Sequence, residues 1–402
     1  MISVKKTNIL QILLLLLILN SCKQKNKEAV LSDEKPKDTM PHMEPPAKKL
    51  PKLTAQYTNS KKNAIEHFYN KNWRNNSMNG SFLVAQNGQI IFEKYDGMAD
   101  FRDERPITAT TPLHLASVSK ILTASAILKL IDAKKISLDQ KVNTILPTFP
   151  FPEVTIKTLL NHRSGMRNYA YFTDKNDGIW DRHKILTNQD ILDLMATKKI
   201  GLESRTDSRF SYCNTNYAIL ALIIEKKTGL SYKNAMQRMI FKPLGMNHTY
   251  VFDYEKDKDT AVTSYKGNKI EIGKDYLDAV YGDKNIYSTP RDLLKFDLAR
   301  NSPDFLSPEL LKLVYTPFSQ EYKGEKNYGL GIRMINWETG QNFYFHNGWW
   351  HGNTSSYITL LKEHVTIIAL SNKFTTKTYQ VRKLAPLFGD YPFKLGNDEK
   401  EE

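Results

Sequence analysis

An apolar segment at residues 121–131 constrains the fold of this chain more than any other stretch. A helix that is apolar on nearly every side belongs inside a large core, so the rest of the chain must fold around it. Ser117 and Lys120 stand just before this segment, and residues three apart on a helix lie on one face. A serine hydroxyl needs an adjacent base to become a nucleophile. A buried lysine can serve, because burial disfavours its charged form.

Ser-x-x-Lys by itself is a weak pattern, because the chain contains it three times, beginning at Ser3, Ser32 and Ser117. Only the third occurrence opens an apolar helix. A lone serine at a helix start is more often an N-cap. The catalytic interpretation of Ser117 therefore requires partners elsewhere in the chain.

The N-terminus predicts secretion and a lipid anchor. Lysines precede an apolar run at residues 9–19, which has the pattern of a signal peptide and is short for a membrane span. The run ends in Leu-Asn-Ser-Cys at Cys22, which resembles the bacterial lipobox, whose cysteine is lipidated. An ordinary signal peptide with an incidental cysteine is the alternative. We expect a lipoprotein signal peptide at 1–21 and anchoring through Cys22 to a membrane of the cell envelope, facing periplasm or exterior.

The region after Cys22 predicts a spacer and then a folded domain. Residues 22–55 are rich in Lys, Glu and Pro, which excludes a continuous helix and favours a disordered tether. A globular pattern follows at 56–392, and a charged tail at 393–402. With Cys22 lipidated, Cys213 has no partner for an intrachain disulfide. We interpret Cys213 as a small buried residue rather than a thiol nucleophile.

The formal net charge of +14 raises the question of a polyanionic partner. The lysines and arginines are scattered and form no nucleic-acid motif, so we expect no nucleic-acid partner. The chain also lacks His-Glu-x-x-His and cysteine clusters, so we expect no metal and no cofactor. We expect a monomer.

Strand-like patterns occupy both ends of the domain. A helical pattern at 63–73 precedes two apolar runs that flank Asn87-Gly88, the strongest short hairpin signal. Strand-like segments near the C-terminus precede a closing helix at 379–387; they lie at 328–335, 343–345, 356–361 and 365–371. This order predicts an α/β (α+β) fold. One antiparallel sheet is built from both termini and flanked by helices, with a helical insertion at about 120–280.

Tyr212 and Asn214 precede a second apolar helix at 218–224. A nearby lysine cation favours a phenolate, so Tyr212 can take the proton of Ser117. The Asn214 amide can hold a substrate carbonyl or orient Lys120. A packing tyrosine and an N-cap asparagine are the alternatives.

His346 and Gly348 close an aromatic strand-like segment. A glycine at a strand edge lets a substrate backbone approach closely. A donor or cation at His346 can hold a carboxylate or the tetrahedral intermediate. A surface histidine beside a turn glycine is the alternative.

Ser-x-x-Lys, Tyr-x-Asn and His-x-Gly in this order resemble the serine β-lactamase and penicillin-binding-protein superfamily. The resemblance is to the branch of class C β-lactamases, D-alanyl-D-alanine carboxypeptidases and esterases, and it covers residues 60–390. Further segments agree with it; they lie at 115–142, 159–166, 241–246 and 285–293. The resemblance implies a β-lactamase/transpeptidase-like fold and acylation of Ser117, with proton transfer shared by Lys120 and Tyr212. It also implies an oxyanion hole from the backbone N–H groups of Ser117 and Trp349.

Two departures from the family pattern bear on the substrate. His346 stands where β-lactamases proper have lysine, and Trp349, Trp350 and His351 stand where small residues are frequent. A histidine near its reference pKa of about 6.5 holds a carboxylate only when protonated. We therefore expect weak β-lactamase activity and a carboxylate preference that strengthens toward pH 6. The aromatics can narrow the groove or form a stacking wall. We interpret His162 as structural.

The sequence thus predicts a serine hydrolase that acts through an acyl-enzyme at the cell envelope. Its substrate would be an ester, amide or D-amino-acid peptide, either a small molecule or derived from peptidoglycan. A β-lactamase or D-alanyl-D-alanine carboxypeptidase proper is one alternative. A catalytically weak peptidoglycan-binding lipoprotein is another, but the intact set of Ser117, Lys120 and Tyr212 favours a hydrolase.

Overall fold

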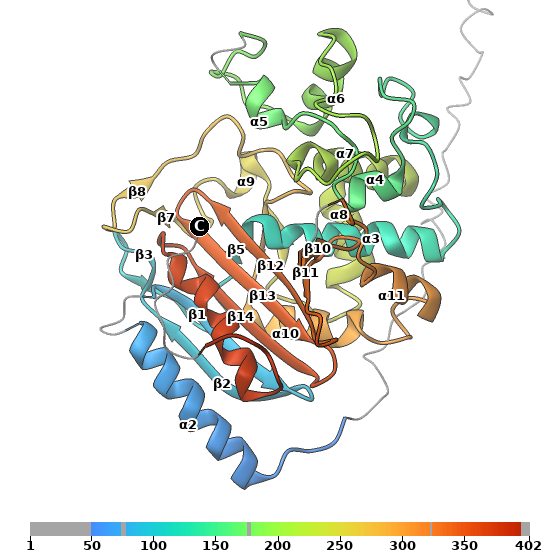
Figure 1. Cartoon of the computed structure of the whole chain (residues 1–402). Coiled ribbons are helices and arrows are strands. Elements are labelled where there is room, and N and C mark those ends of the chain that lie inside the picture. Colours follow the sequence, from blue (N-terminus) through green and yellow to red (C-terminus); the bar gives the residue numbers. More distant parts are fainter. Residues whose placement is uncertain (1–49, 74–77, 175–177, 322–323, 395–402) are drawn as a thin grey trace, which may run out of the picture. The chain divides into compact units, whose positions relative to one another are not determined.

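The computed structural model describes residues 50–73, 78–174, 178–321 and 324–394 (Figure 1). The expected signal peptide, Cys22 and most of the expected tether and tail lie outside these residues. Within the described ranges, no helix combines the length and the apolar character that crossing a bilayer requires.

A seven-stranded sheet forms the centre of the domain, and all its strand pairs are antiparallel. The strands run in the order β10-β11-β12-β13-β14-β1-β2 across the sheet. Their bounds are β1 (Gly80–Gln86), β2 (Gln89–Asp96), β10 (Lys326–Tyr328), β11 (Arg333–Asn336), β12 (Asn342–Trp350), β13 (Asn353–Leu360) and β14 (Val365–Ser371). Strand β1 pairs with β14, so the two ends of the domain lie side by side (Figure 1). The prediction of one antiparallel sheet built from both termini is confirmed.

The turns of the sheet follow from local backbone chemistry. Asn87 and Gly88 have φ values of 53° and 75°, as a two-residue turn of this hairpin type requires. The single strand expected at 328–335 is wrong, because a turn divides it into β10 and β11. Gly331 in this turn has φ 87°, and a Cβ there would lie 2.3 Å from the Cβ of Ala124. The chain turns here so that it can pass close to the buried helix.

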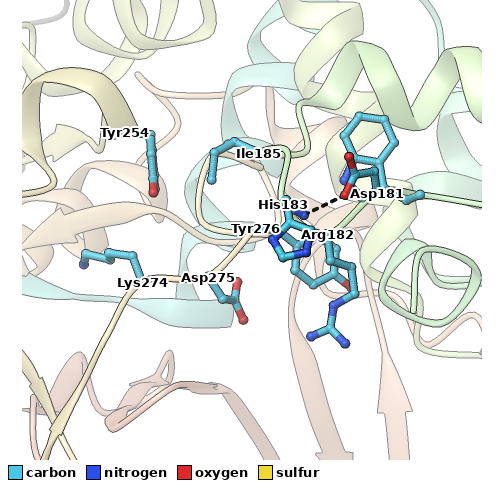
Figure 2. Close-up of a pocket in the computed structure, with 9 residues that line it drawn as sticks. Asp181, Arg182, His183, Ile185, Tyr254, Lys274, Asp275 and Tyr276 are labelled. Carbon is cyan, nitrogen blue, oxygen red and sulfur yellow. Dashed lines mark hydrogen bonds between the residues drawn. The ribbon is translucent and has the colours of Figure 1, made fainter. Parts of the chain in front are cut away.

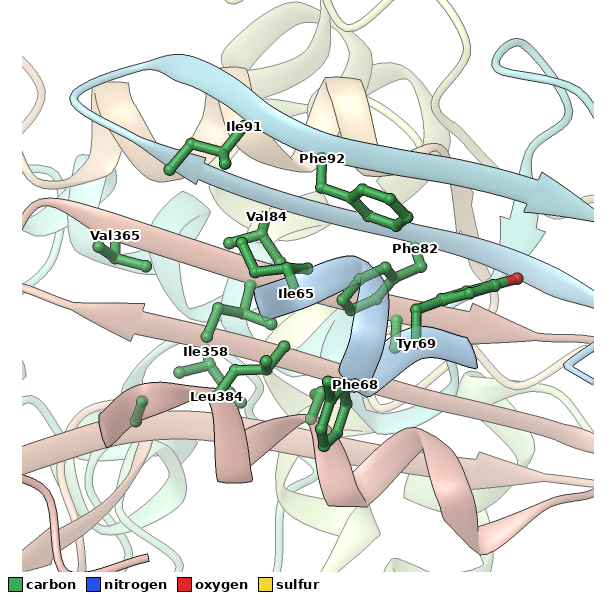
Figure 3. Packing of buried hydrophobic residues seen from close by; sticks show 14 of the residues in the cluster. Ile65, Phe68, Tyr69, Phe82, Val84, Ile91, Phe92, Ile358, Val365 and Leu384 are labelled. Atoms are coloured by element: carbon green, nitrogen blue, oxygen red, sulfur yellow. The ribbon is translucent and has the colours of Figure 1, made fainter. Parts of the chain in front are cut away.

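An apolar cluster lies between the sheet and two helical segments, one near the N-terminal end of the domain and one near its C-terminal end (Figure 3). Helix α2 (Ala55–Asn72) begins after Thr54, whose side chain caps the Tyr57 N–H. The closing segment η5 (Thr376–Leu387), which covers the helix expected at 379–387, is a 3₁₀ helix and contains Pro386. Phe68 of α2 and Leu384 of η5 pack into the same cluster. This layer buries one face of the sheet.

Helices and short strands make up the rest of the domain, as the predicted helical insertion requires. The buried helix is α3 (Ser119–Asp132), and it packs on α7 (Asn214–Thr228). The other helices are α4 (Ile156–Leu160), α5 (Tyr169–Phe172), α6 (Asn188–Thr197), α8 (Tyr232–Met236), α9 (Tyr254–Asp257), α10 (Pro290–Arg300) and α11 (Pro308–Val314), with 3₁₀ or π turns η2 (Ala116–Val118), η3 (Val142–Thr144) and η4 (Gln237–Phe241). Three small sheets pair β3 (Met98–Asp100) with β4 (Arg105–Pro106), β7 (Ser264–Tyr265) with β8 (Glu271–Ile272), and β9 (Ile286–Ser288) with both β5 (Leu113–His114) and β6 (Tyr250–Val251).

We expect the apolar cluster between the sheet and α2 to contribute strongly to the free energy of unfolding. Phe82 on β1 is fully buried, and its ring lies 5.6 Å from those of Tyr69 and Trp73. Phe82→Ala should lower the free energy of unfolding by about 3–5 kcal/mol, because it removes buried apolar surface and leaves a cavity. Ile90→Ala on β2 is the control, because Ile90 is 38% exposed. The control should change the value by about 0.5 kcal/mol or less. Urea denaturation measures both, and equal losses in the two variants would contradict this account of the core.

Candidate active site

Ser117 and Lys120 meet at the start of the buried helix, as the spacing predicted. Ser117 lies in η2, directly before α3, and is partly exposed. Lys120 is fully buried. Its Nζ donates hydrogen bonds to Ser117 Oγ at 3.0 Å and to the main-chain oxygen of Asp283 at 2.9 Å. The Asp283 oxygen therefore helps to hold the Lys120 amine beside the Ser117 hydroxyl.

The turn before Ser117 is held in an unusual backbone conformation. Ala116 has φ 46°, a region that non-glycine residues adopt at a cost and that often marks functional sites. Its N–H donates to Nδ1 of His114 at 2.9 Å, and Nε2 of His114 lies 3.0 Å from Asn285 Oδ1. Burial lowers the pKa of His114 to about 3, so the ring stays neutral and Nδ1 remains an acceptor. Nothing in the local sequence indicates this role of His114.

Strand β12 runs against the turn at Ser117 through Gly348. A Cβ at this position would lie 2.8 Å from Ser117 N and 2.6 Å from the Leu115 oxygen. Ser355 on the neighbouring strand donates from Oγ to the same Leu115 oxygen at 2.6 Å. The approach of β12 to Ser117 therefore requires a glycine. The same approach brings Trp349, the next residue along β12, close to the turn at Ser117.

Tyr212 lies in the loop before α7 and is partly buried. Its ring centre is 5.1 Å from Lys120 Nζ and 4.6 Å from Cζ of Arg333. Lys120 thus contacts both of its predicted partners, Ser117 through a hydrogen bond and Tyr212 through its ring.

Asn214 is the first residue of α7, and Cys213 occupies the N-cap position. The alternative of an N-cap asparagine is therefore wrong. Asn214 Oδ1 is buried and has no hydrogen-bond partner among the described residues, so it is free to accept a bond from a ligand. Cys213 is buried, and burial raises the pKa of its thiol to about 11. This agrees with a small buried residue and not with an activated thiol.

His346 is fully buried, so it is not a surface histidine. Nδ1 lies 2.8 Å from the Asn347 oxygen, and Nε2 lies 3.1 Å from the Tyr328 hydroxyl. A carbonyl only accepts, so Nδ1 carries the proton and Nε2 accepts from Tyr328. Burial and the nearby charges of Arg333 and Lys120 lower the pKa of His346 well below 6.5. The expectation that His346 binds carboxylates better toward pH 6 is therefore wrong, because the ring stays neutral there.

The two tryptophans after Gly348 point to different environments. Trp349 is 63% exposed, and its ring centre lies 6.4 Å from that of Phe374. The Trp350 ring instead packs 4.7 Å from Lys284 Nζ, and Nε1 donates to Asp278 Oδ1 at 2.7 Å. Of the two rings, only that of Trp349 is placed to form the expected wall at the surface.

One group of side chains in the described part of the chain has the composition of a metal site: Asp275, Asp278 and His351. Burial would raise the pKa of Asp278, but hydrogen bonds from His351 and Trp350 lower it to about 2. His351 Nε2 lies 3.1 Å from both Asp278 oxygens. Protein donors thus already bind the Asp278 carboxylate.

A cavity of about 690 Å³ lies beside this group, with Asp275 in its lining (Figure 2). Its lining residues are Trp180, Asp181, Arg182, His183, Ile185, Tyr254, Lys274, Asp275 and Tyr276. Asp275 belongs both to the lining of this cavity and to the group around Asp278, because its N–H donates to Asp278 Oδ2 at 2.6 Å. None of the predicted catalytic or substrate-binding residues lines this cavity.

Arg333 and Asp283 are site residues that the sequence analysis missed. Arg333 on β11 is partly buried and forms no salt bridge within the described ranges. Its position opposite Phe345, one residue before His346, depends on the register of β11 and β12. Asp283 contributes a main-chain oxygen, which any residue type could supply. Neither position carries a local sequence signal.

Comparison with known proteins gives one family. The family model described as Beta-lactamase matches residues 69–387. Penicillin-binding protein 4* of Bacillus subtilis (strain 168) is 31% identical over 317 residues, covering 75% of this chain and 70% of that protein. Teichoic acid D-alanine hydrolase of Staphylococcus aureus is 28% identical over 256 residues, 62% of each chain. The crystal structure of a penicillin-binding protein from Bacillus halodurans superposes with a TM-score of 0.70 at 22% identity, covering 80% of this chain and 98% of that one.

The close approach at Gly348 predicts a selective loss of acylation. Gly348→Ala should slow acylation of Ser117 by about 10²-fold, because displacing a reacting group by about 1 Å has this effect. Gly273→Ala is the matched control, since a Cβ there meets nothing within 4 Å. Stopped-flow acylation with a chromogenic ester measures both variants. Equal rates in the two would show that the contact between β12 and Ser117 is not needed.

Proposed function

The chain belongs to the β-lactamase family, within the serine β-lactamase and penicillin-binding-protein superfamily, and is a serine hydrolase; we propose that it acts through an acyl-enzyme on Ser117. The proposed substrates are esters, amides or peptides of D-amino acids at the cell envelope. The observation that carries this proposal is the hydrogen bond from buried Lys120 to the hydroxyl of Ser117. A buried amine next to a serine hydroxyl is the arrangement that activates a nucleophile.

The geometry supports the following sequence of steps. Ser117 Oγ attacks the substrate carbonyl while its proton passes to Lys120, with Tyr212 sharing the transfer. The tetrahedral oxyanion is stabilised by the backbone N–H groups of Ser117 and Trp349. The proton then goes to the leaving oxygen or nitrogen, and the carbonyl–leaving-group bond breaks. Water then gives a proton to the same groups and attacks the acyl carbonyl. The bond between the acyl carbon and Ser117 Oγ breaks, and Oγ takes the proton back.

Two further residues support recognition of an acylated amino acid. Asn214 Oδ1 is a buried acceptor without a partner in the described chain, and it is suited to an amide or ammonium N–H of the acyl portion. Arg333 is a permanently charged donor beside Tyr212 and His346, without a salt bridge in the described residues. We propose that Arg333, rather than His346, attracts a substrate carboxylate, because guanidinium groups suit planar carboxylates. His346 then acts as a neutral neighbour of the substrate.

Hydrolysis of D-alanyl groups is the form of this activity that we favour. The chain is similar to a teichoic acid D-alanine hydrolase, and its site lacks the lysine expected of β-lactamases. Hydrolysis of β-lactams or of D-alanyl-D-alanine termini remains the alternative, which Arg333 could support. A binding protein without turnover is less well supported, since binding alone does not need Lys120 beside Ser117.

The proposal includes the location of the enzyme. Lipidation of Cys22 and a tether at 22–55 would hold the domain away from a membrane of the envelope. Envelope esters and peptides would then be its natural substrates. We propose that the domain acts there as a monomer.

Loss of the nucleophile tests the proposed function directly. Ser117→Ala should abolish hydrolysis of a D-alanyl ester and labelling by a fluorophosphonate, while the melting temperature stays near that of the wild type. The reason is that, among the described residues, Ser117 Oγ is the only hydroxyl that forms a hydrogen bond with Lys120 Nζ. Labelling that persists at another residue, found by peptide mapping, would refute the assignment.

Replacement of Arg333 tests carboxylate recognition. Arg333→Gln should raise KM for a carboxylate-bearing ester about tenfold or more, the scale of one lost charged hydrogen bond, and leave KM for a neutral ester of the same size unchanged. In the wild type, the preference for the carboxylate ester should stay flat from pH 6 to 8. The guanidinium remains charged over that range, while the lowered pKa of His346 keeps it neutral.

Arg333→Lys is the control that keeps the charge, and it should retain most of the preference. A preference that survives Arg333→Gln, or that strengthens as the pH falls to 6, would assign carboxylate binding to another group.

A further inference from the structure

His162 lies in the turn after α4. It contacts three consecutive residues, 211–213, of the loop that precedes α7 and carries Tyr212. Its main-chain oxygen accepts from the Ser211 N–H at 2.9 Å. Its Nδ1 accepts from the Cys213 N–H at 3.2 Å. Between these two bonds, its ring packs on the Tyr212 ring, with ring centres 4.3 Å apart and planes inclined by 37°. Through these three contacts, His162 holds the two residues that flank Tyr212 and the Tyr212 ring itself.

The hydrogen bonds fix the tautomer of His162. A main-chain N–H can only donate, so Nδ1 is an acceptor and the neutral ring carries its proton on Nε2. The Asn216 amide nitrogen also contacts Nδ1 at 3.2 Å, and Asn216 Oδ1 accepts from Ser164 Oγ at 2.6 Å. This second bond orients the Asn216 amide so that its NH₂ group faces His162.

The opposite side of the ring shows that packing alone does not explain a histidine here. His162 is fully buried, and its Nε2 has no hydrogen-bond partner in the described chain. A buried donor without a partner is unfavourable, and phenylalanine would fill the same space without it. The benefit that distinguishes histidine from phenylalanine is the acceptor at Nδ1, which binds the peptide after Tyr212.

The backbone of His162 supports the same conclusion. Its φ is 58°, in the left-handed region that costs energy for most side chains. This conformation lets the main-chain oxygen and Nδ1 of one residue both reach the loop at 211–213. The following residue, Arg163, adds an ion pair from Nε to Asp207 at 2.6 Å, which anchors the chain that leads into this loop.

We infer that His162 is a positioning residue for Tyr212, which it holds beside Lys120 through the peptide N–H groups on both sides and through ring contact. The inference rests on the proposed function, because it concerns the proton transfer at Ser117. His162 does not itself touch the reacting atoms in this account.

Two substitutions separate the contributions of His162. His162→Phe keeps a ring against Tyr212 but removes the acceptor. His162→Asn keeps an acceptor atom near the place of Nδ1 and tolerates a left-handed backbone, but removes the ring. With a small neutral ester, His162→Phe should lower kcat about 10²-fold, the scale of general base catalysis, with KM within about threefold. His162→Asn should lose less than about tenfold.

A double-mutant cycle with Tyr212→Phe distinguishes positioning from general damage. When the phenol is already absent, His162→Phe should lower kcat by less than about threefold, because the group it positions is gone. The same loss in both backgrounds, or a larger loss for Asn than for Phe, would overturn the inference. If His162→Phe does not fold, the cycle is run with His162→Asn, and its residual loss should likewise vanish in the Tyr212→Phe background.

A spectroscopic readout keeps the test independent of turnover. Protein labelled with ¹³C at tyrosine Cζ should give one sharp Tyr212 signal, assigned by its loss in Tyr212→Phe. His162→Phe should broaden or split this signal, and His162→Asn should change it less. A sharp, unshifted signal in His162→Phe would contradict the inference even if the wild type hydrolyses no ester tested. Inactive wild type with the expected signal changes would contradict only the proposed function.

Discussion

The site depends on one buried amine. Lys120 Nζ lies between the hydroxyl of Ser117 and the main-chain oxygen of Asp283, with its side chain fully buried. It forms no salt bridge in the described ranges, and taking an amine out of water costs free energy. The rings of Tyr212 and Tyr217, at 5.1 and 5.7 Å, offer partial compensation. We therefore expect Lys120 to lower the stability of the fold, which agrees with the catalytic role that we propose for it.

The architecture follows from the need to bring three distant segments to this amine. The turn η2 supplies Ser117, helix α3 supplies Lys120, the loop before α7 supplies Tyr212, and β12 supplies Gly348. The pairing of β1 with β14 joins the two ends of the domain in one sheet, in which β12 lies between β11 and β13. The segment between β8 and β9 supplies the main-chain oxygen of Asp283. Strand β12 reaches Ser117 only because Gly348 has no side chain.

The parts of this arrangement that depend on local chemistry could be predicted from the sequence. The spacing of Ser117 and Lys120 places them on one helical face, and Asn87-Gly88 specifies its turn by its own backbone preference. The parts that depend on register and packing could not. Arg333 becomes a site residue only through the pairing of β11 with β12. The family resemblance supplied the order of the motifs, but only the packing shows that His346 is buried and neutral.

We propose that Lys120 is the base of a serine hydrolase and that its burial lowers the stability of the fold. The most direct test is rapid-quench measurement of acyl-Ser117 formation in Lys120→Met, by intact-protein mass spectrometry during hydrolysis of a D-alanyl ester. Methionine fills a similar volume without the amine, so the account predicts acylation slowed by at least about 10²-fold, in a protein that unfolds at the same or a higher temperature. Acylation at the wild-type rate would contradict the central role of Lys120.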